Sequence, residues 1–459
     1  MKQAFTLASF ALVLLFSGCI SPTPPSLPSP PVQNAEKIEW WKELGDVHLN
    51  QLAADALKEN LSLQMAKQRV LQAYALSQNK QSALLPSLSY NSSATLKDEF
   101  KGTESNQDLY TANLTASYEV DIFGKKSDIR DAATASYKAS LESLHVSSIS
   151  LVAELANSWY TLGYKSQSLA LLEEQLGVAL KTLRITELKH ESGKNSITDI
   201  WQQKQYVSSL KAQKISLESD IEAQKRALNL LLGRSALSDI GVAKEAKLIT
   251  LPLVPELGIP AFALTQRPDV KQAYYNLEAA NSSLAEAIKN QYPSLNLSFI
   301  VGSTSSVTQF SNLLDTILGT AVASLSGTLF DGGAKEALVK QANFISKERS
   351  LNYKQTLLQA FYEVQDALEK EKNTLIYLNH LNERIFLSKA TFERQLEKYR
   401  FGVVEYLSVV TAEQSLHELE QSYLTKQLEL IKYRISLHRS LAGGFLSFDI
   451  SHEWSRDDN

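Results

Sequence analysis

Polar and apolar residues alternate near residue 110, and this alternation predicts a β-strand. From Tyr110 to Asp121 the odd positions carry Thr, Asn, Thr, Ser, Glu and Asp, whereas the even positions are apolar or aromatic. Successive side chains of a strand point to opposite faces, so one face would be apolar and the other polar. At about 3.3 Å per residue, a dozen residues reach about 40 Å, which is enough to cross the apolar layer of a bilayer when tilted.

The pattern predicts two strands near the front of the chain, at about 87–97 and 109–121, and two more at about 294–302 and 319–330. Four membrane strands cannot close on themselves, and an open edge in lipid would leave backbone groups without partners. If these strands span a membrane, the chain has to oligomerise. Two chains would supply eight strands and three would supply twelve, and the sequence does not choose between them. The alternative is that these are hairpins of a soluble sandwich.

Long segments with apolar residues at spacings of three, four and seven predict helices packed on neighbouring helices. One runs from Lys125 to about Glu191 with glycine only at Gly163 and Gly177, and another runs from Ala334 to about Arg400 without glycine or proline. At about 1.5 Å per residue, each would be roughly 100 Å long. Shorter helices are predicted from the same kind of spacing, and their ranges are about 49–84, 197–232 and 406–441.

The chain repeats itself at an offset of 207 to 210 residues. Pro86 corresponds to Pro293, and Gly193 to Gly402, with similar residues around each pair. A period of this length exceeds the roughly 20 to 50 residues of solenoid repeats, so each copy must be a multi-element unit. The predicted organisation is a signal peptide (1–18), a lipidated tether (19–47), a first repeat (48–242) with a helical hairpin at 125–232, a linker (243–265), a second repeat (266–443) with a helical hairpin at 334–442, and a C-terminal tail (444–459).

The first residues are typical of a secretory signal with a lipidation site. A charged Lys2 precedes an apolar run that ends in Ser17-Gly18-Cys19, and this run is too short to span a bilayer. The segment resembles the bacterial lipobox, in which the cysteine is acylated. An ordinary signal peptide with an incidental cysteine is the alternative. Cys19 is the only cysteine, which excludes an internal disulfide, and the proline-rich segment 21–31 predicts an extended tether.

Charge and motifs argue against an enzyme or a nucleic-acid partner. The net charge is -4, so there is no basic excess for nucleic acid. The seven histidines are scattered without a metal-ligand spacing, and the chain lacks a phosphate-binding glycine loop and a nucleophile elbow. We therefore expect neither catalytic residues nor a metal or other cofactor.

Several segments together resemble the outer-membrane factor family, which comprises channels of the TolC and OprM type, here closest to the lipoprotein branch that includes NodT-type proteins. The resemblance covers nearly all of the mature chain. It rests on four segments, which are Arg267-Pro268-Asp269-Val270, the turn from Tyr118 to Gly124, the turn Leu329-Phe330-Asp331-Gly332-Gly333, and the tip from Tyr399 to Leu416.

The resemblance implies a mostly α-helical fold with a membrane β-barrel portion. Each chain would supply a strand hairpin and a long helical hairpin twice, and a homotrimer would form a β-barrel in the outer-membrane lipid and an α-barrel in the periplasm. Such a lipid-anchored channel would be the exit of a tripartite efflux system and conduct small molecules passively. Its implied partners are a periplasmic adaptor protein and an inner-membrane pump that supplies energy.

Candidate site residues lie at the tips of the two helical hairpins. Gly193 and Gly402 are most simply helix-ending residues, and their matched placement also makes them candidates for adaptor docking. Asp199 and Tyr399 resemble a family pair that bonds across helices near the aperture. The alternative is that Asp199 is only a helix-start residue stabilised by the helix dipole. Where the family often has an aspartate, this chain has Thr411. The substitute carboxylates nearby are Glu405 and Glu413.

Two other functions remain open at this stage. A type I protein secretion duct would use the same architecture for a larger cargo. A periplasmic scaffold lipoprotein would use the long helices only as a coiled coil, but it has no evident need for four membrane strands. The sequence names neither the substrate nor the class of pump.

Overall fold

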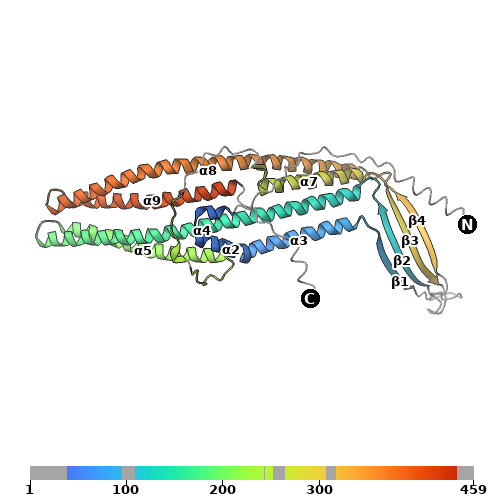
Figure 1. The fold of residues 1–459 in the computed structure, drawn as a ribbon, viewed down its shortest axis with the longest axis horizontal. Helices are drawn as coiled ribbons and strands as arrows, with labels where there is room; N and C mark the ends of the chain where they lie inside the picture. The colour runs from blue at the N-terminus through green and yellow to red at the C-terminus, as the bar shows by residue number, and fades with distance from the viewer. Residues whose placement is uncertain (1–38, 96–108, 242, 252–263, 306–316, 442–459) are drawn as a thin grey trace. The chain divides into compact units, whose positions relative to one another are not determined.

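Long antiparallel helices and one small sheet make up the fold (Figure 1). The computed structural model describes residues 39–95, 109–241, 243–251, 264–305 and 317–441. These fall into two compact units. The sheet unit contains Arg69–Leu141 and Lys271–Gln355, and the hairpin unit contains the other described residues. Both units draw on both sequence repeats, so a repeat is not a separate body in space.

The sheet unit holds four antiparallel strands in the order β1-β2-β3-β4. Two strands come from each repeat, and their bounds are Ser87–Thr95 (β1), Leu109–Val120 (β2), Ser294–Ser305 (β3) and Leu318–Ser326 (β4). The strands β2 and β3 pair directly, which joins the two repeats in one sheet. Among the described residues, β1 and β4 each pair with one neighbour, so each leaves one edge open.

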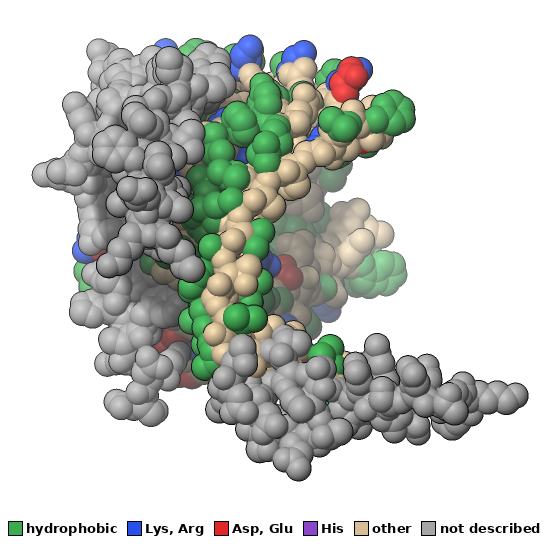
Figure 2. All heavy atoms as spheres, turned by 90° about the vertical axis from the view of Figure 1, so that its right-hand side faces the viewer, with side chains coloured by type: hydrophobic (Ala, Val, Ile, Leu, Met, Phe, Trp, Pro, Cys, Tyr) green, Lys and Arg blue, Asp and Glu red, His purple; other side chains and the backbone are tan. Residues whose placement is uncertain are grey.

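The register aligns the apolar positions of all four strands on one face of the sheet. Leu114 of β2 lies opposite Tyr90 of β1 on one side and Val301 of β3 on the other, and Leu295 of β3 lies opposite Leu325 of β4. Serine, threonine and asparagine dominate the other face. Figure 2 shows hydrophobic side chains gathered along the strands. Several of them are largely exposed in the single chain, among them Leu88, Tyr90, Leu114, Phe299 and Leu325.

Each long helix begins after the sheet on an aspartate that caps it. At the start of α4 (Lys125–Glu191), the carboxylate of Asp121 accepts the backbone N–H groups of Lys126 and Ser127 at 2.9 and 2.8 Å. Asp331 plays the same part before α8 (Ala334–Arg400), since it accepts the N–H of Lys335 at 3.1 Å. Such a carboxylate satisfies N–H groups that have no partner within the helix. The two strand-to-helix turns therefore carry a structural requirement for aspartate.

The hairpin unit contains the greater parts of α4 and α8 with their returning helices, α5 (Ile197–Leu231) and α9 (Tyr406–Ser440). Corresponding helices have equal lengths, 67 residues for α4 and α8 and 35 for α5 and α9. Near the ends of the hairpins, apolar side chains form two clusters, one mainly of α8 and α9 around Val409 and one of α4 and α5 around Ala179. Val178 and Ile185 of α4 also pack on the first cluster, so the two hairpins share a core.

The single helix expected at about 49–84 is two helices, α2 (Val47–Glu59) and α3 (Leu61–Ser82). They separate at Asn60, whose backbone leaves the helical conformation with ψ of 120°. The side chain of Asn60 accepts the N–H of Leu63 at 2.9 Å and donates to the carbonyl of Leu231 at 2.9 Å. A contact distant in sequence thus fixes the break, and no glycine or proline marks it.

Two arginines of the hairpin unit are buried with carboxylate partners. Arg434 of α9 binds Glu371 of α8 through two nitrogens at 3.0 and 2.5 Å. Arg267 precedes α7 (Pro268–Lys289) and donates to Asp269, Glu363 and the carbonyl of Ser440 at 2.7, 2.7 and 3.0 Å. The Arg-Pro-Asp-Val motif therefore ties the start of α7 to α8 and the end of α9.

None of the helices in the described ranges combines the length and apolarity required to cross a bilayer. The lipidation candidate Cys19, the tether before residue 39, residues 96–97 of the first expected strand, residues 252–263 of the linker and the C-terminal tail lie outside the described residues.

Candidate functional site

Both hairpin tips turn at a glycine with the same backbone geometry. Gly193 has φ of 70° and Gly402 has φ of 77°. The N–H of Gly193 donates to the carbonyl of His190 at 2.8 Å, and the next N–H donates to the carbonyl of Lys189 at 2.9 Å. Gly402 and its successor repeat both bonds at 3.0 and 2.9 Å. This is a glycine-terminated helix end, in which positive φ satisfies carbonyls left open by the helix.

The first tip is bonded to the end of α8 at Tyr399. The side-chain amide of Asn195 donates to the Tyr399 hydroxyl at 3.0 Å and to the carbonyl of Thr186 at 3.2 Å. The Lys189 ammonium group donates to the Tyr399 carbonyl and lies 3.9 Å from the centre of its ring. Burial raises the pKa of Tyr399, so its hydroxyl stays neutral. One tyrosine therefore joins the tips of the two hairpins.

Asp199 and Tyr399 are near one another, but the described residues show no hydrogen bond between them. The charge of Asp199 raises the pKa of Tyr399, after burial as the main cause, while the direct bond to the hydroxyl comes from Asn195. Asp199 is half-buried in the first turn of α5, where a carboxylate is favoured by the helix dipole. The cap itself is Ser196, whose hydroxyl accepts the N–H of Thr198 at 3.2 Å.

The two candidate carboxylates of the second tip occupy opposite environments. Glu405 is exposed at the start of α9 and its side chain makes no capping bond. Glu413, two turns further along α9, is wholly buried at 0 % exposure. Its nearest polar groups belong to Thr182 of α4 and Gln203 of α5, and burial raises its pKa to about 7. Glu413 is thus an interior residue of the hairpin unit, whereas Glu405 lies at the surface of the chain.

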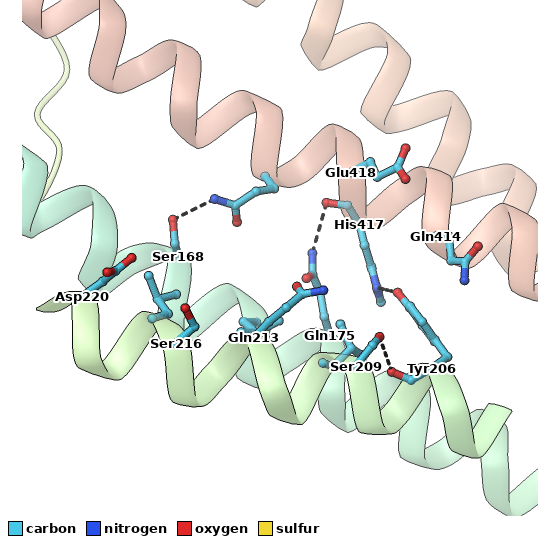
Figure 3. Close-up of a pocket in the computed structure, with 14 residues that line it drawn as sticks. Ser168, Gln175, Tyr206, Ser209, Gln213, Ser216, Asp220, Gln414, His417 and Glu418 are labelled. Atoms are coloured by element: carbon cyan, nitrogen blue, oxygen red, sulfur yellow. Dashed lines mark hydrogen bonds between the residues drawn. The ribbon is translucent and has the colours of Figure 1, made fainter. Parts of the chain in front are cut away.

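A polar groove of about 740 Å³ lies beside this interior cluster, between α9 and the pair α4 and α5 (Figure 3). The Tyr206 hydroxyl of α5 lies 2.6 Å from Nδ1 of His417 on α9, and the Gln175 amide of α4 donates to Glu420 at 3.0 Å. Burial lowers the pKa of His417 to about 4. The groove is rich in amide and hydroxyl groups, and no three His, Cys, Asp or Glu residues in the described part of the chain are arranged to hold a metal ion.

Sequence reasoning did not find Lys189, Asn195, Thr182 or Gln203. Polar residues occur throughout amphipathic helices, so their type alone does not distinguish a buried position from a solvated one. The available signal was positional, because Asn195 immediately follows the helix-ending Gly193 and Gln203 lies one turn beyond Asp199. Only packing of the two hairpins shows that these side chains meet Tyr399 and Glu413.

Comparison with known proteins supports one assignment. The family model described as outer membrane efflux protein matches residues 52–234 and 259–443. The probable outer membrane lipoprotein SilC of Salmonella typhimurium is 28 % identical, over 96 % of this chain and 99 % of SilC. The cation efflux system protein CusC of Escherichia coli K12 is 25 % identical over 95 % and 99 %, and the pyoverdine export outer membrane protein OpmQ of Pseudomonas putida is 26 % identical over 95 % and 96 %.

Solved structures show the same fold. The outer-membrane channel OprN superposes with a TM-score of 0.84 at 23 % identity, covering 93 % of this chain and 99 % of OprN. The mostly helical chain with its small antiparallel sheet matches that channel in architecture. Since the family model spans most of both repeats, the conclusion does not depend on the structural likeness alone. The chain belongs to the outer membrane efflux protein family.

Proposed function

We propose that this protein is the outer-membrane exit channel of a tripartite efflux system and conducts small molecules passively as a homotrimer. The observation that carries the proposal is the sheet, in which a continuous apolar face is combined with two open edges. A sheet in lipid has to close, because unpaired backbone groups are costly there. Membership in a family of outer-membrane efflux proteins agrees with transport and not with enzymatic activity.

Closure requires β4 of one copy to pair with β1 of the next copy. The intrachain registers predict how, because β3 corresponds to β1 with an offset of 207 residues and β4 corresponds to β2 with an offset of 209. The pairing of Leu114 with Val301 within the chain then predicts that Ala323 lies opposite Ala94 of the next copy. Both side chains belong to the apolar face of the sheet.

Cysteine crosslinking tests this assembly. We expect Ala94→Cys combined with Ala323→Cys to form disulfide-linked dimers and trimers in outer membranes under mild oxidation. Thr320→Cys combined with Ala94→Cys is the matched control, because residue 320 faces the other side of the sheet and should crosslink poorly. If neither cysteine pair gave crosslinked oligomers, and if the protein formed no pores in planar bilayers, the channel proposal would be contradicted. A scaffold lipoprotein would then be favoured.

The hairpin unit supports assembly from several copies as well. Its long helix α8 exposes large apolar side chains in the single chain, including Leu358, Tyr362, Phe386 and Leu387. Exposed apolar residues in such number on one helix are typical of an interface. Neighbouring copies packed side by side would cover them and form the periplasmic α-barrel.

The relatives give no reason to assign one cargo. Proteins of similar identity to this chain are named for cations, for pyoverdine and for toluene, which have little chemistry in common. A passive exit duct would accept what its pump delivers, so we assign small molecules as the cargo class. Co-purification with the adaptor and identification of the pump captured beside it would name the system. A captured protein substrate would favour type I secretion instead.

The tips are the proposed aperture and docking site for the adaptor. Asp199 and Tyr399 would hold the tips together, Glu405 would present charge at the opening, and the turns at Gly193 and Gly402 would meet the adaptor. If Asp199→Ala combined with Tyr399→Phe left conductance and antibiotic uptake unchanged, the role of this pair in closure should be dropped. Loss of adaptor binding in a Gly193→Val, Gly402→Val double variant, with normal oligomer formation, would support docking at the turns.

Cys19 would anchor the mature chain to outer-membrane lipid after removal of residues 1–18. The relative SilC is named a lipoprotein, which agrees with this proposal. Mass spectrometry of the purified N-terminal peptide tests it, since acylation adds a diacylglyceryl group and fatty acid to residue 19. An unmodified peptide beginning elsewhere would contradict the lipid anchor but leave the channel proposal untouched.

A further inference from the structure

Glu413 is a buried acid without the partners that an ionised carboxylate needs. Its side chain is wholly buried, and in the described part of the chain neither oxygen has a hydrogen-bond partner. A buried charge is stable only when it is paired or well hydrogen-bonded. The environment of Glu413 therefore favours the neutral, protonated form.

The two nearest polar side chains offset only part of the cost of a negative charge, because Gln203 and Thr182 act to lower the pKa of Glu413 and burial still raises it. Thr182 of α4 presents a single hydroxyl, which is buried and makes no hydrogen bond of its own within the described residues. The Gln203 amide already donates to the carbonyl of Ala179 at 2.8 Å, and its oxygen accepts a bond from the Tyr406 hydroxyl. A protonated Glu413 could donate to Thr182 and an ionised one could accept from it, but one neutral hydroxyl does not replace the water that a charged carboxylate loses on burial.

Among the described residues, no cation affects the pKa of Glu413. The charge of Glu413 acts on Tyr206 of α5 and Tyr406 of α9, and the other groups that act on these two tyrosines are Asp199, Tyr399, Glu418 and Glu420. His417 is neutral at pH 7, because burial lowers its pKa to about 4. On α4, the charged Lys189 is engaged with the ring and carbonyl of Tyr399. Tyrosines and carboxylates make up the remainder, and ionised carboxylates oppose further negative charge.

The position of Glu413 connects this acid to the packing of the tips. The apolar cluster of α8 and α9 lies around Val409 and Leu416, on the same helix as Glu413. Its contacts Thr182 and Gln203 lie on α4 and α5, the first hairpin. The carboxyl group is therefore located where the two hairpins of one chain meet, and the next residue, Gln414, lines the groove in Figure 3. Water could reach it if α9 moved away from α4 and α5.

We infer that Glu413 is a proton-binding group whose neutral form holds α9 against α4 and α5, and whose ionisation favours separation of these helices at the tip. For conductance, this inference rests on the proposed channel function. The packed arrangement binds the proton because a charge in its dry interior lacks compensation, and the separated arrangement releases it because water solvates the carboxylate.

The direction of the pH effect follows from proton linkage. Burial raises the pKa of packed Glu413 to about 7 from its ordinary value of 4.5, so the packed state binds more protons than the separated state between pH 4.5 and pH 7. Separation therefore becomes more favourable as pH rises through this range and changes little above about pH 7. For a carboxyl with these two pKa values, the ratio of separated to packed states increases about tenfold between pH 6 and pH 8.

The full-length chain carrying Glu413→Gln provides the test, because glutamine keeps the size of the acid and cannot ionise. Conductance in planar bilayers and hydrogen exchange of residues 406–420 are measured at pH 6 and pH 8 for variant and wild type. Dividing the wild-type value by the variant value at each pH removes the general effect of pH on the rate of hydrogen exchange and on ion conduction. We expect this ratio of wild type to variant to rise about tenfold from pH 6 to pH 8, both for conductance and for hydrogen exchange.

Glu393→Gln is the matched control, since it removes one exposed carboxylate from α8 near the same tip and should follow the wild type. Should the glutamine variant not fold, Glu413→Met removes the titrating group in the same way and carries the same expectation. A ratio that stays constant from pH 6 to pH 8 in hydrogen exchange overturns the inference. If wild type and all variants lack conductance but hydrogen exchange shows the expected pH effect, the channel proposal is contradicted. The proton-binding role of Glu413 is then still supported.

Discussion

The side-chain amide of Asn195 lies 3.0 Å from the hydroxyl of Tyr399, and this bond joins the turn of the first helical hairpin to the last turn of α8 in the second. The two residues are 204 positions apart in the chain. Tyr399 is only 2 % exposed, so its hydroxyl has little access to water as a replacement partner. Removing either side of this bond therefore leaves a buried polar group without its main partner.

Asn195→Ala and Tyr399→Phe should each loosen the tip, and the double variant should be little worse than either single one. Each change removes the same bond, for which a coupling of about 1 kcal/mol is expected. A double-mutant cycle on the unfolding free energy measures it. Ser192→Ala is the control, because that exposed hydroxyl donates to the carbonyl of Leu188 at 2.6 Å, in the helix that it follows. Additive effects of the two variants would show that the bond is not made in solution.

Glu371→Gln should destabilise the hairpin unit by about 3–5 kcal/mol, because it removes the carboxylate that binds the buried Arg434 through two nitrogens. Replacing both residues, by Glu371→Leu and Arg434→Met, should be close to neutral, since no buried charge remains and the volumes are similar. Chemical denaturation of the three proteins measures the difference. A single variant as stable as wild type would mean that water reaches this pair in solution.

Sequence periodicity predicts the long helices well because their limits are local. Each long helix follows a strand and a capped turn, contains no proline, and ends at a glycine. The structure places α4 at Lys125–Glu191, the range that the sequence pattern predicts. The break at Asn60 was missed because it depends on the carbonyl of Leu231. The burial of Glu413 was missed for a similar reason. Its carboxyl faces residues of the other hairpin, and no spacing along α9 reveals them.

The two glycines inside α4 should respond in opposite directions to replacement by alanine. A Cβ at Gly163 would lie 2.9 Å from the backbone nitrogen of Lys247, so the crossing segment would have to move. A Cβ at Gly177 would meet nothing within 4 Å. Alanine is favoured over glycine in a helix by about 1 kcal/mol, so Gly177→Ala should stabilise the protein. Gly163→Ala should destabilise it, by about 1–3 kcal/mol for an overpacked site.

Thermal unfolding measures the stability of both glycine variants relative to wild type, with a gain expected for Gly177→Ala and a loss for Gly163→Ala. Each variant serves as the control for the other. Both substitutions add the same methyl group to the same helix. If both variants were stabilised equally, Lys247 would not lie against α4 in solution. If both were destabilised, Gly177 would have a contact that the single chain does not contain, such as one with a neighbouring copy.

His438 should make the protein less stable in acid. Its ring stacks on Trp40 with centroids 5.4 Å apart, and burial, aided by the charge of Arg434, lowers its pKa to about 4 from its ordinary value of 6.5. The folded state therefore binds fewer protons than the unfolded state in this range. Stability is lost as pH falls from about 6.5 towards 4, by up to about 3 kcal/mol for a shift of this size.

His438→Phe isolates this contribution, because phenylalanine can keep the stack on Trp40 and cannot take up a proton. We expect the variant to differ little from wild type at pH 7 and to be more stable at pH 4.5. The comparison also removes the effect of Glu413, which acts in the opposite direction over the same range but is present in both proteins. His380→Phe controls for loss of an exposed histidine from α8. A difference between wild type and His438→Phe that is the same at both pH values would mean that His438 is solvated, and that the N-terminal segment around Trp40 does not cover the end of α9.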